Sequence, residues 1–178
     1  LPTIRSRCIK IKFNNPSKEI FNKILSNYET IDTDKNIDFL FDISNNSPGL
    51  SLKLNELNLL QDFDDLIFLF KNNICLSNDI YDFSSRVSQY NNENFKLYLS
   101  LIRFIIINTI KINLEIKINN YYHSYLSNIL VDLSQHIDNN ISLKILDYLD
   151  FNEKNLFIFN LDKRIFNLNL FSNLPSKI

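Results

Sequence analysis

Residues 59–110 read LLQDFDDLIFLFKNNICLSNDIYDFSSRVSQYNNENFKLYLSLIRFIIINTI, and their pattern predicts the fold class of the chain. It contains neither Pro nor Gly, and its apolar residues recur at the three- and four-residue spacing of amphipathic helices. The same pattern continues downstream and predicts six helices, over 59–73, 78–91, 95–110, 121–137, 141–149 and 161–173. The chain is therefore expected to be mainly α-helical.

Asparagine pairs separate these predicted helices, at 72–73, 91–92, 119–120 and 139–140. Asn tolerates turn and left-handed conformations, so we expect the pairs to form turns that Gly forms in other chains. Residues 110–118 depart from the helical pattern, because Ile or Leu alternates there with Lys, Asn or Glu, which is typical of a strand. No partner strand is evident nearby, and this segment is expected to be helical or irregular.

Three shorter helices are predicted upstream, within residues 17–57. Ser17 can accept a backbone hydrogen bond as the N-cap of the first helix. The second helix follows Thr33. Ser47 can cap the third helix, with Pro48 at its first position, where a missing N–H costs little.

The first thirteen residues, LPTIRSRCIKIKF, differ from the rest of the chain. Apolar and basic residues alternate over residues 9–13, which predicts a short strand with one buried face. Five basic residues and no acidic one lie between Leu1 and Lys18, so this end is locally cationic.

The whole chain has 178 residues, of which 45% are hydrophobic and 22% are charged, as in ordinary globular domains. Its 19 basic and 20 acidic residues give a net charge of −1, so bulk charge does not favour nucleic acid or an acidic membrane as a partner. The chain has one Gly and no Met, Trp or Ala, which indicates a genome under strong A/T pressure. The absence of Met, also at position 1, predicts that the chain is a fragment.

Several kinds of active site are excluded. A single glycine rules out the Gly-rich phosphate loops of nucleotide-binding enzymes, so we expect no self-contained active site and no bound cofactor. Cys8, Cys75, His123 and His136 do not have the spacing of a zinc site or a disulfide framework, and no metal is expected. Charged and amide residues interrupt the apolar stretch 99–118, so we expect no membrane contact and a cytoplasmic location.

Other conspicuous residues have structural interpretations. The aromatic residues recur at helical spacing and are expected in the core, among them Phe63, Phe68, Phe70 and Phe104. The carboxylates Asp62, Asp64 and Asp65 start a predicted helix, where they suit the positive end of its dipole. Both histidines are expected to be packed or on the surface.

Arg5 and Arg7 are two of only five arginines in the chain. Two arginines this close indicate a need for the planar guanidinium, which binds phosphate oxygens in a bidentate manner. From the residues alone, a solvated basic loop remains the simplest interpretation, and a patch for the DNA backbone is another.

LPTIRSRC followed by an alternating strand resembles the end of the ATPase core in clamp-loader subunits of the AAA+ class, where a Ser-Arg-Cys motif carries an arginine finger. Residues 44–54, SNNSPGLSLKL, resemble the Ser-Pro-Gly stretch of the delta-prime family of bacterial DNA polymerase III subunits. Residues 159–174, FNLDKRIFNLNLFSNL, are similar to the opening of that family's last helix. The middle of the chain, 58–158, matches only in its helical pattern.

The resemblance implies three parts. Residues 1–15 would end an AAA+ core, with the finger motif and a strand, residues 16–57 would form a three-helix lid, and residues 58–178 would form a helical collar. The implied role is in DNA replication, as a polymerase III subunit that helps load the sliding clamp onto primed DNA. Its partners would be the gamma/tau and delta subunits of a hetero-pentamer, with the clamp and DNA contacted indirectly.

The resemblance also implies roles for residues of the first motif. Arg7 would be an arginine finger acting in trans on ATP-Mg bound in a neighbouring subunit, and Ser6 and Cys8 would position it. Arg5 could help hold the finger, touch DNA phosphate or be solvated.

Ser47, Pro48 and Gly49 would form the lid motif. The ATPase paralogue, gamma/tau, has an Arg in the corresponding sensor region, whereas this chain has Leu50 and Ser51 after the glycine. The missing cation favours delta-prime. A gamma/tau fragment and a helical scaffold with no nucleotide role remain the alternatives.

Overall fold

The computed structural model describes residues 14–28, 33–57, 59–72, 78–116, 124–172 and 174. Within these ranges all the regular secondary structure is helical, which confirms the expectation of a mainly α fold. The helices are α2 (Lys18–Leu25), α3 (Thr33–Ile43), α4 (Pro48–Glu56), α5 (Leu59–Asn72), α6 (Asn78–Ser88), α7 (Asn92–Asn113), α8 (Ser124–Ser134), α9 (Asn139–Ile158) and α10 (Lys163–Ser172).

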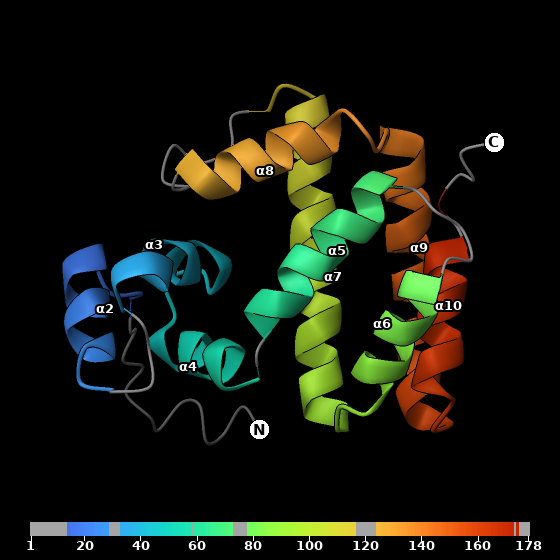
Figure 1. The fold of residues 1–178 in the computed structure, drawn as a ribbon, viewed down its shortest axis with the longest axis horizontal. Helices are drawn as coiled ribbons and strands as arrows, with labels where there is room; N and C mark the ends of the chain where they lie inside the picture. The colour runs from blue at the N-terminus through green and yellow to red at the C-terminus, as the bar shows by residue number, and fades with distance from the viewer. Residues whose placement is uncertain are drawn as a thin grey trace, which may run out of the picture.

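The helices form two neighbouring groups (Figure 1). Helices α2, α3 and α4 contact one another pairwise, and α4 leads directly into α5 of the larger group. The buried side chains of both groups belong to one hydrophobic core. Phe39 on α3 and Phe63 on α5 join them, with ring centroids 4.8 Å apart in an edge-to-face arrangement.

Helix α7 is the axis of the larger group, and it contacts α5, α8 and α9 (Figure 1). It is apolar on several sides, as expected of a helix that is surrounded by others. Phe95, Leu99, Ile102, Ile105 and Ile106 are all fully buried along it. Helix α10 returns to pack on α6 and α9, so the last helix closes the core.

Side-chain caps fix where several helices begin. Ser47 accepts a hydrogen bond from the N–H of Leu50 (3.4 Å), and Ser17 caps α2 in the same way. Asn91 caps α7 through the N–H of Asn94 (2.9 Å). Asp138 caps α9 through the N–H of Ile141 (2.8 Å).

Three helices end in a left-handed residue that is not glycine. The positions are Asn45 after α3, Glu115 after α7 and Asn160 after α9, with φ values of 51°, 55° and 48°. In each case the next residue's N–H bonds back five residues to a helical carbonyl, which is the Schellman arrangement. At two of these three helix ends, Asn therefore takes the place that Gly usually has.

The asparagine pairs at 91–92 and 139–140 were expected to form turns, and this is wrong. Asn91 is an N-cap, and Asn92, Asn139 and Asn140 lie in the first turns of α7 and α9. Asn side chains serve helix starts as well as helix ends, so the pair alone does not distinguish them.

Two predicted helices are too short. Helix α7 extends over Asn92–Asn113 rather than 95–110, and α9 over Asn139–Ile158 rather than 141–149. The second half of α9 is rich in polar residues and escapes the periodicity, but Leu156 anchors it in the core. The strand-like segment 110–118 is helical to Asn113 and then turns, as far as residue 116, where the described part ends.

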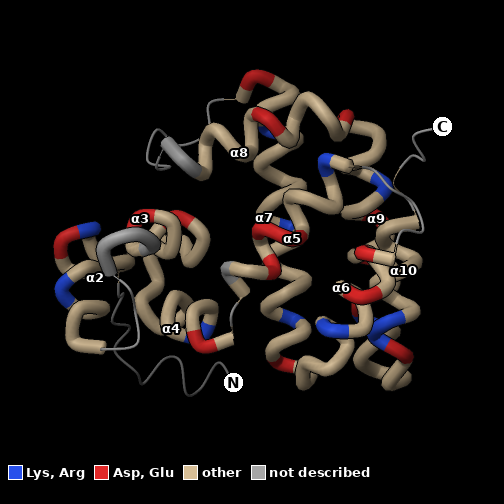
Figure 2. Tube along the Cα trace, in the orientation of Figure 1, with Lys and Arg blue, Asp and Glu red and all other residues tan. Residues whose placement is uncertain are grey.

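Acidic and basic positions occur on both groups of helices (Figure 2). Within the described ranges, none of the helices combines the length and the apolar character needed to cross a bilayer.

Candidate functional site

The predicted finger motif lies outside the described residues. Ser6, Arg7 and Cys8, and with them Arg5 and the expected strand, fall within residues 1–13. Cys75 and His123 also lie outside the described ranges. The predicted roles of these residues therefore stay predictions.

Ser47, Pro48 and Gly49 lie together at the start of α4. Ser47 is the N-cap and Pro48 occupies the first turn, as the sequence predicts. A Cβ on Gly49 would meet no described atom within 4 Å, so neither packing nor a left-handed backbone requires a glycine here. The motif therefore forms the start of α4, and the space beside Gly49 is open.

The same turn is tied to the neighbouring helix. The Ser51 hydroxyl, which is fully buried, lies 3.0 Å from the carbonyl oxygen of Ser47 and 3.5 Å from that of Leu40 on α3. Leu50, between them in sequence, is partly buried against the core. The start of α4 is thus held by packing and by a hydroxyl that lies within reach of two carbonyls.

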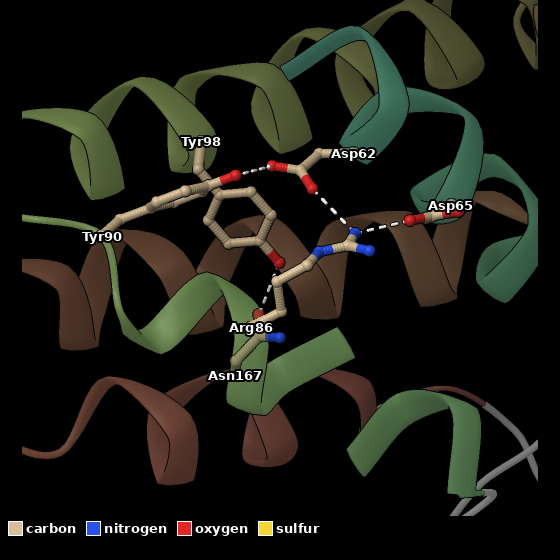
Figure 3. A network of polar contacts seen from close by, with 6 residues as sticks. All are labelled: Asp62, Asp65, Arg86, Tyr90, Tyr98 and Asn167. Carbon is tan, nitrogen blue, oxygen red and sulfur yellow. Dashed lines mark hydrogen bonds and ion pairs between the residues drawn. The ribbon is translucent and has the colours of Figure 1, made fainter. Parts of the chain in front are cut away.

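A polar network around the buried carboxylate of Asp62 joins α5, α6 and the turn between α6 and α7 (Figure 3). Asp62 on α5 is only 2% exposed, and it accepts hydrogen bonds from the guanidinium of Arg86 (2.8 Å) and from the hydroxyl of Tyr90 (2.6 Å). Arg86 on α6 also pairs with Asp65, one turn along α5, at 2.5 Å. One arginine therefore clamps two carboxylates of the neighbouring helix.

A second, uncharged set of contacts continues toward α10. The hydroxyl of Tyr98 on α7 donates to Asn167 on α10 (2.6 Å), and the Asn167 amide donates to Ser84 on α6 (2.9 Å). All three side chains are fully buried. The Lys163 ammonium donates to the carbonyl of Tyr90 at 2.6 Å, so four helices share one connected region of polar contacts.

Burial dominates the electrostatics of this region. Desolvation raises the pKa of Asp62, and the hydrogen bonds from Tyr90 and Arg86 oppose that rise. Desolvation, and the bond to an already anionic Asp62, raise the pKa of Tyr90 well above its usual range. Tyr90 therefore remains a neutral donor, and the network is suited to fixing the helices.

An open groove of about 370 Å³ lies beside the network, between α5 and α6. Its lining comprises Asp65, Phe68, Leu69, Asp79, Asp82, Phe83 and Arg86. The one basic group, Arg86, is already engaged by Asp62 and Asp65. No set of three or more His, Cys, Asp or Glu side chains within the described ranges could hold a metal ion.

Sequence reasoning missed the role of Asp62. It was expected only to suit the positive end of the helix dipole, yet its carboxylate is buried and bonded to residues 24 and 28 positions away. The local sequence did not mark Asp62, because it follows Gln61 and lies close to two further carboxylates, Asp64 and Asp65. Its partner could not be identified before α5 and α6 were placed together.

The aromatic expectations are confirmed in part. Phe63 and Phe70 are fully buried, and Phe104 is partly buried against the core. Phe68 is 52% exposed at the groove, so its expected core position is wrong, because α5 turns that face outward. His136 lies on the surface beside Asp132, at 3.8 Å.

Comparison of the chain with protein-family models, with curated proteins and with solved structures found no match.

Proposed function

We propose that this chain is the lid and collar of a bacterial clamp-loader subunit of the delta-prime kind, which assists ATP hydrolysis in a neighbouring AAA+ subunit. The observation that carries the proposal is the position of Ser47-Pro48-Gly49 at the start of α4, the third of three helices that contact one another pairwise. In the AAA+ resemblance, this motif belongs to the sensor region of a small three-helix lid.

The residue after the motif supports an assisting role rather than an ATPase role. Leu50 is aliphatic and partly buried against the core, where an ATPase paralogue would offer an arginine to its own nucleotide. The next basic residue on α4 is Lys53, one turn later, and it lines a surface depression with Glu56 and Glu93. A lid of this composition would not sense a γ-phosphate bound to the same chain.

The helices after α4 are suited to a collar. Large apolar side chains are exposed around the turn between α9 and α10, namely Phe159, Leu161 and Ile165. Clusters of exposed apolar side chains are typical of surfaces that bind other proteins. In the proposed assembly such a surface contacts the gamma/tau and delta collars.

The proposed chemistry is phosphoryl transfer assisted in trans. Arg7 would approach the γ-phosphate of ATP-Mg held by the neighbouring subunit and neutralise charge that develops in the transition state. Ser6 and Cys8 would fix the loop that carries it. A lysine could supply the charge but not the bidentate guanidinium contact.

The test is ATP turnover by the loader reconstituted from this protein and the gamma/tau and delta subunits of the same organism, with clamp and primed DNA. We expect Arg7→Ala and Arg7→Lys to lower turnover at the neighbouring site by roughly 10³-fold or more, without preventing assembly. Lys10→Ala, three residues further on, is the matched control and is expected to retain activity. Wild-type turnover by both Arg7 variants would disprove the finger.

Assembly is tested separately by pull-down of gamma/tau and delta with the full chain. Binding to both is expected, and the variant Phe159→Glu should weaken it by about tenfold because it charges the exposed apolar turn. A chain that retains neither partner would leave the helical scaffold as the better interpretation.

A further inference from the structure

Helix α9 has a buried apolar face and, on its opposite side, exposed apolar residues that alternate with charged ones. Ser142, Ile145, Leu149 and Leu156 are buried against the rest of the molecule. Leu143, Phe151 and Ile158 are 50%, 80% and 60% exposed, and they alternate along the helix with the exposed residues Asp147 and Lys154.

These five exposed residues, which we call the α9 outer stripe, share one side of the helix. At about 100° per residue they fall within roughly 80° of arc, and the buried residues lie on the opposite side. The stripe is about 22 Å long, at 1.5 Å per residue. An amphipathic surface helix normally has one apolar face, so the outer stripe calls for a partner outside the chain.

The order of charges along the outer stripe is self-complementary. The midpoint between Asp147 and Lys154 coincides with the midpoint between Leu143 and Ile158, and it lies within one residue of Phe151. When two copies of α9 are antiparallel about this point, each Asp147 faces Lys154 of the other copy. The same register sets each Leu143 against Ile158, and the two Phe151 rings meet near the symmetry axis.

Neither charge is engaged within the described part of the chain. Asp147 and Lys154 are exposed and form no ion pair with another described residue. Asp150, which also borders the stripe, is already bound by Arg103 at 2.9 Å and is directed toward α7. The complementary pair is therefore available for contacts between molecules.

We propose that the α9 outer stripe is a homodimer interface, in which two copies of this chain pair through antiparallel α9 helices. A twofold interface requires a patch that complements itself, and both the charges and the apolar residues of the stripe meet this condition in one register. The partner is thus a second copy of the chain, since a different partner would not require this symmetry.

The contact is small, so the dimer is in exchange with monomer. Stable interfaces bury about 1,200–2,000 Å² in total, and one helix pair of about four turns lies at or below the lower end. Buried area alone does not set the affinity, but a contact of this size belongs with weak, transient interfaces.

The experiment is sedimentation velocity of the purified chain over a concentration series from about 1 to 500 µM, which spans the range in which a weak, exchanging dimer is populated. The wild-type chain should shift from monomer to dimer. Phe151→Glu should weaken the dimer by about tenfold or more, since it places two carboxylates at the symmetry axis. Ile20→Glu, at an apolar site on α2 that is 54% exposed, is the control and should dimerise like the wild type.

A charge swap tests the register. Asp147→Lys and Lys154→Asp should each weaken the dimer by about threefold to tenfold, because each creates like-charge pairs across the interface. The double variant restores both pairs and should return to within about threefold of the wild type. Circular dichroism and the unfolding midpoint of each variant check that the fold is retained.

A wild-type chain that stays monomeric throughout the series would overturn the proposal. So would a double variant no better than the single ones. The dimer does not rest on the proposed function, because it is measured with this chain alone, and its failure would leave the trans-acting finger to be judged by its own assay.

Discussion

Arg86 and Arg103 each bridge two carboxylates of a neighbouring helix, but in different surroundings. Arg86 joins α6 to Asp62 and Asp65 on α5, and the Asp62 carboxylate is 2% exposed. Arg103 joins α7 to Asp150 and Glu153 on α9, and the Asp150 side chain is 74% exposed. The guanidinium therefore binds a buried carboxylate, Asp62, in the first clamp and a largely solvated carboxylate, Asp150, in the second.

The difference indicates that the burial of the carboxylate determines how much each arginine clamp contributes to the free energy of unfolding. Removing one member of a buried pair leaves other polar groups without partners and without water, which costs several kcal/mol. Removing a solvated member costs about 1 kcal/mol or less, because water replaces the lost contact. The following variants separate the two cases.

The largest effect is expected for Asp62→Ala. It leaves the hydroxyl of Tyr90 without its acceptor and opens a small cavity, while Arg86 keeps Asp65, so we expect a loss of about 2–3 kcal/mol in the free energy of unfolding. Urea denaturation measures it. Asp64→Ala, two residues away and exposed, is the control and should change stability by less than about 0.5 kcal/mol.

Tyr98→Phe extends the buried side of the comparison to an uncharged pair. The variant leaves the carbonyl oxygen of Asn167 buried without the donor that lies at 2.6 Å, and the expected loss is about 1.5 kcal/mol. Tyr81→Phe is the control, since Tyr81 is half exposed. Equal losses for both variants would contradict a role for burial.

Asp150→Ala breaks the exposed clamp. Arg103 retains Glu153, and water reaches the vacated position, so the expected loss is about 0.5 kcal/mol or less. The same urea experiment measures it, with and without about 1 M salt, which screens the exposed contact. A loss as large as that of Asp62→Ala would show that the comparison is wrong.

The smallest effect concerns pH. Burial raises the pKa of Asp62 above the ordinary value of an aspartate, so between that ordinary pKa and the raised pKa the folded protein binds a proton that the unfolded chain releases. The proton-linked part of the stability is therefore full below the unfolded pKa and is lost as pH rises through the folded pKa. Unfolding of wild type and Asp62→Asn between about pH 4 and pH 7 should show this slope in their difference. A difference that increases with pH would contradict it.

Local signals predicted much of the fold. The caps Ser17 and Ser47 located the starts of α2 and α4, because a side chain that bonds its own helix needs no distant partner. The second half of α9 was missed, because its place in the core depends on Leu156 meeting residues from other helices.

The polar network could not be predicted from the sequence, because its partners belong to different helices. Tyr98 and Asn167 are 69 positions apart, and Ser84 and Asn167 are 83 apart. No periodicity within a helix carries information on contacts at this range. The N-cap role of Ser47 was predicted and is confirmed. The roles of Ser47-Pro48-Gly49 as a lid motif and of Arg7 as a finger remain predictions.

Glu115 ends α7 in a left-handed conformation that an L-residue with a long side chain adopts at a cost, whereas glycine adopts it freely. Glycine codons are rich in G and C. A genome under strong A/T pressure would therefore rarely place glycine at this position, even though the backbone conformation favours it. Heat-selected libraries of this gene, freed from that bias, should accumulate Glu115→Gly early. The thermal tolerance of the protein would then be limited by the mutational history of its genome as well as by the packing of its core.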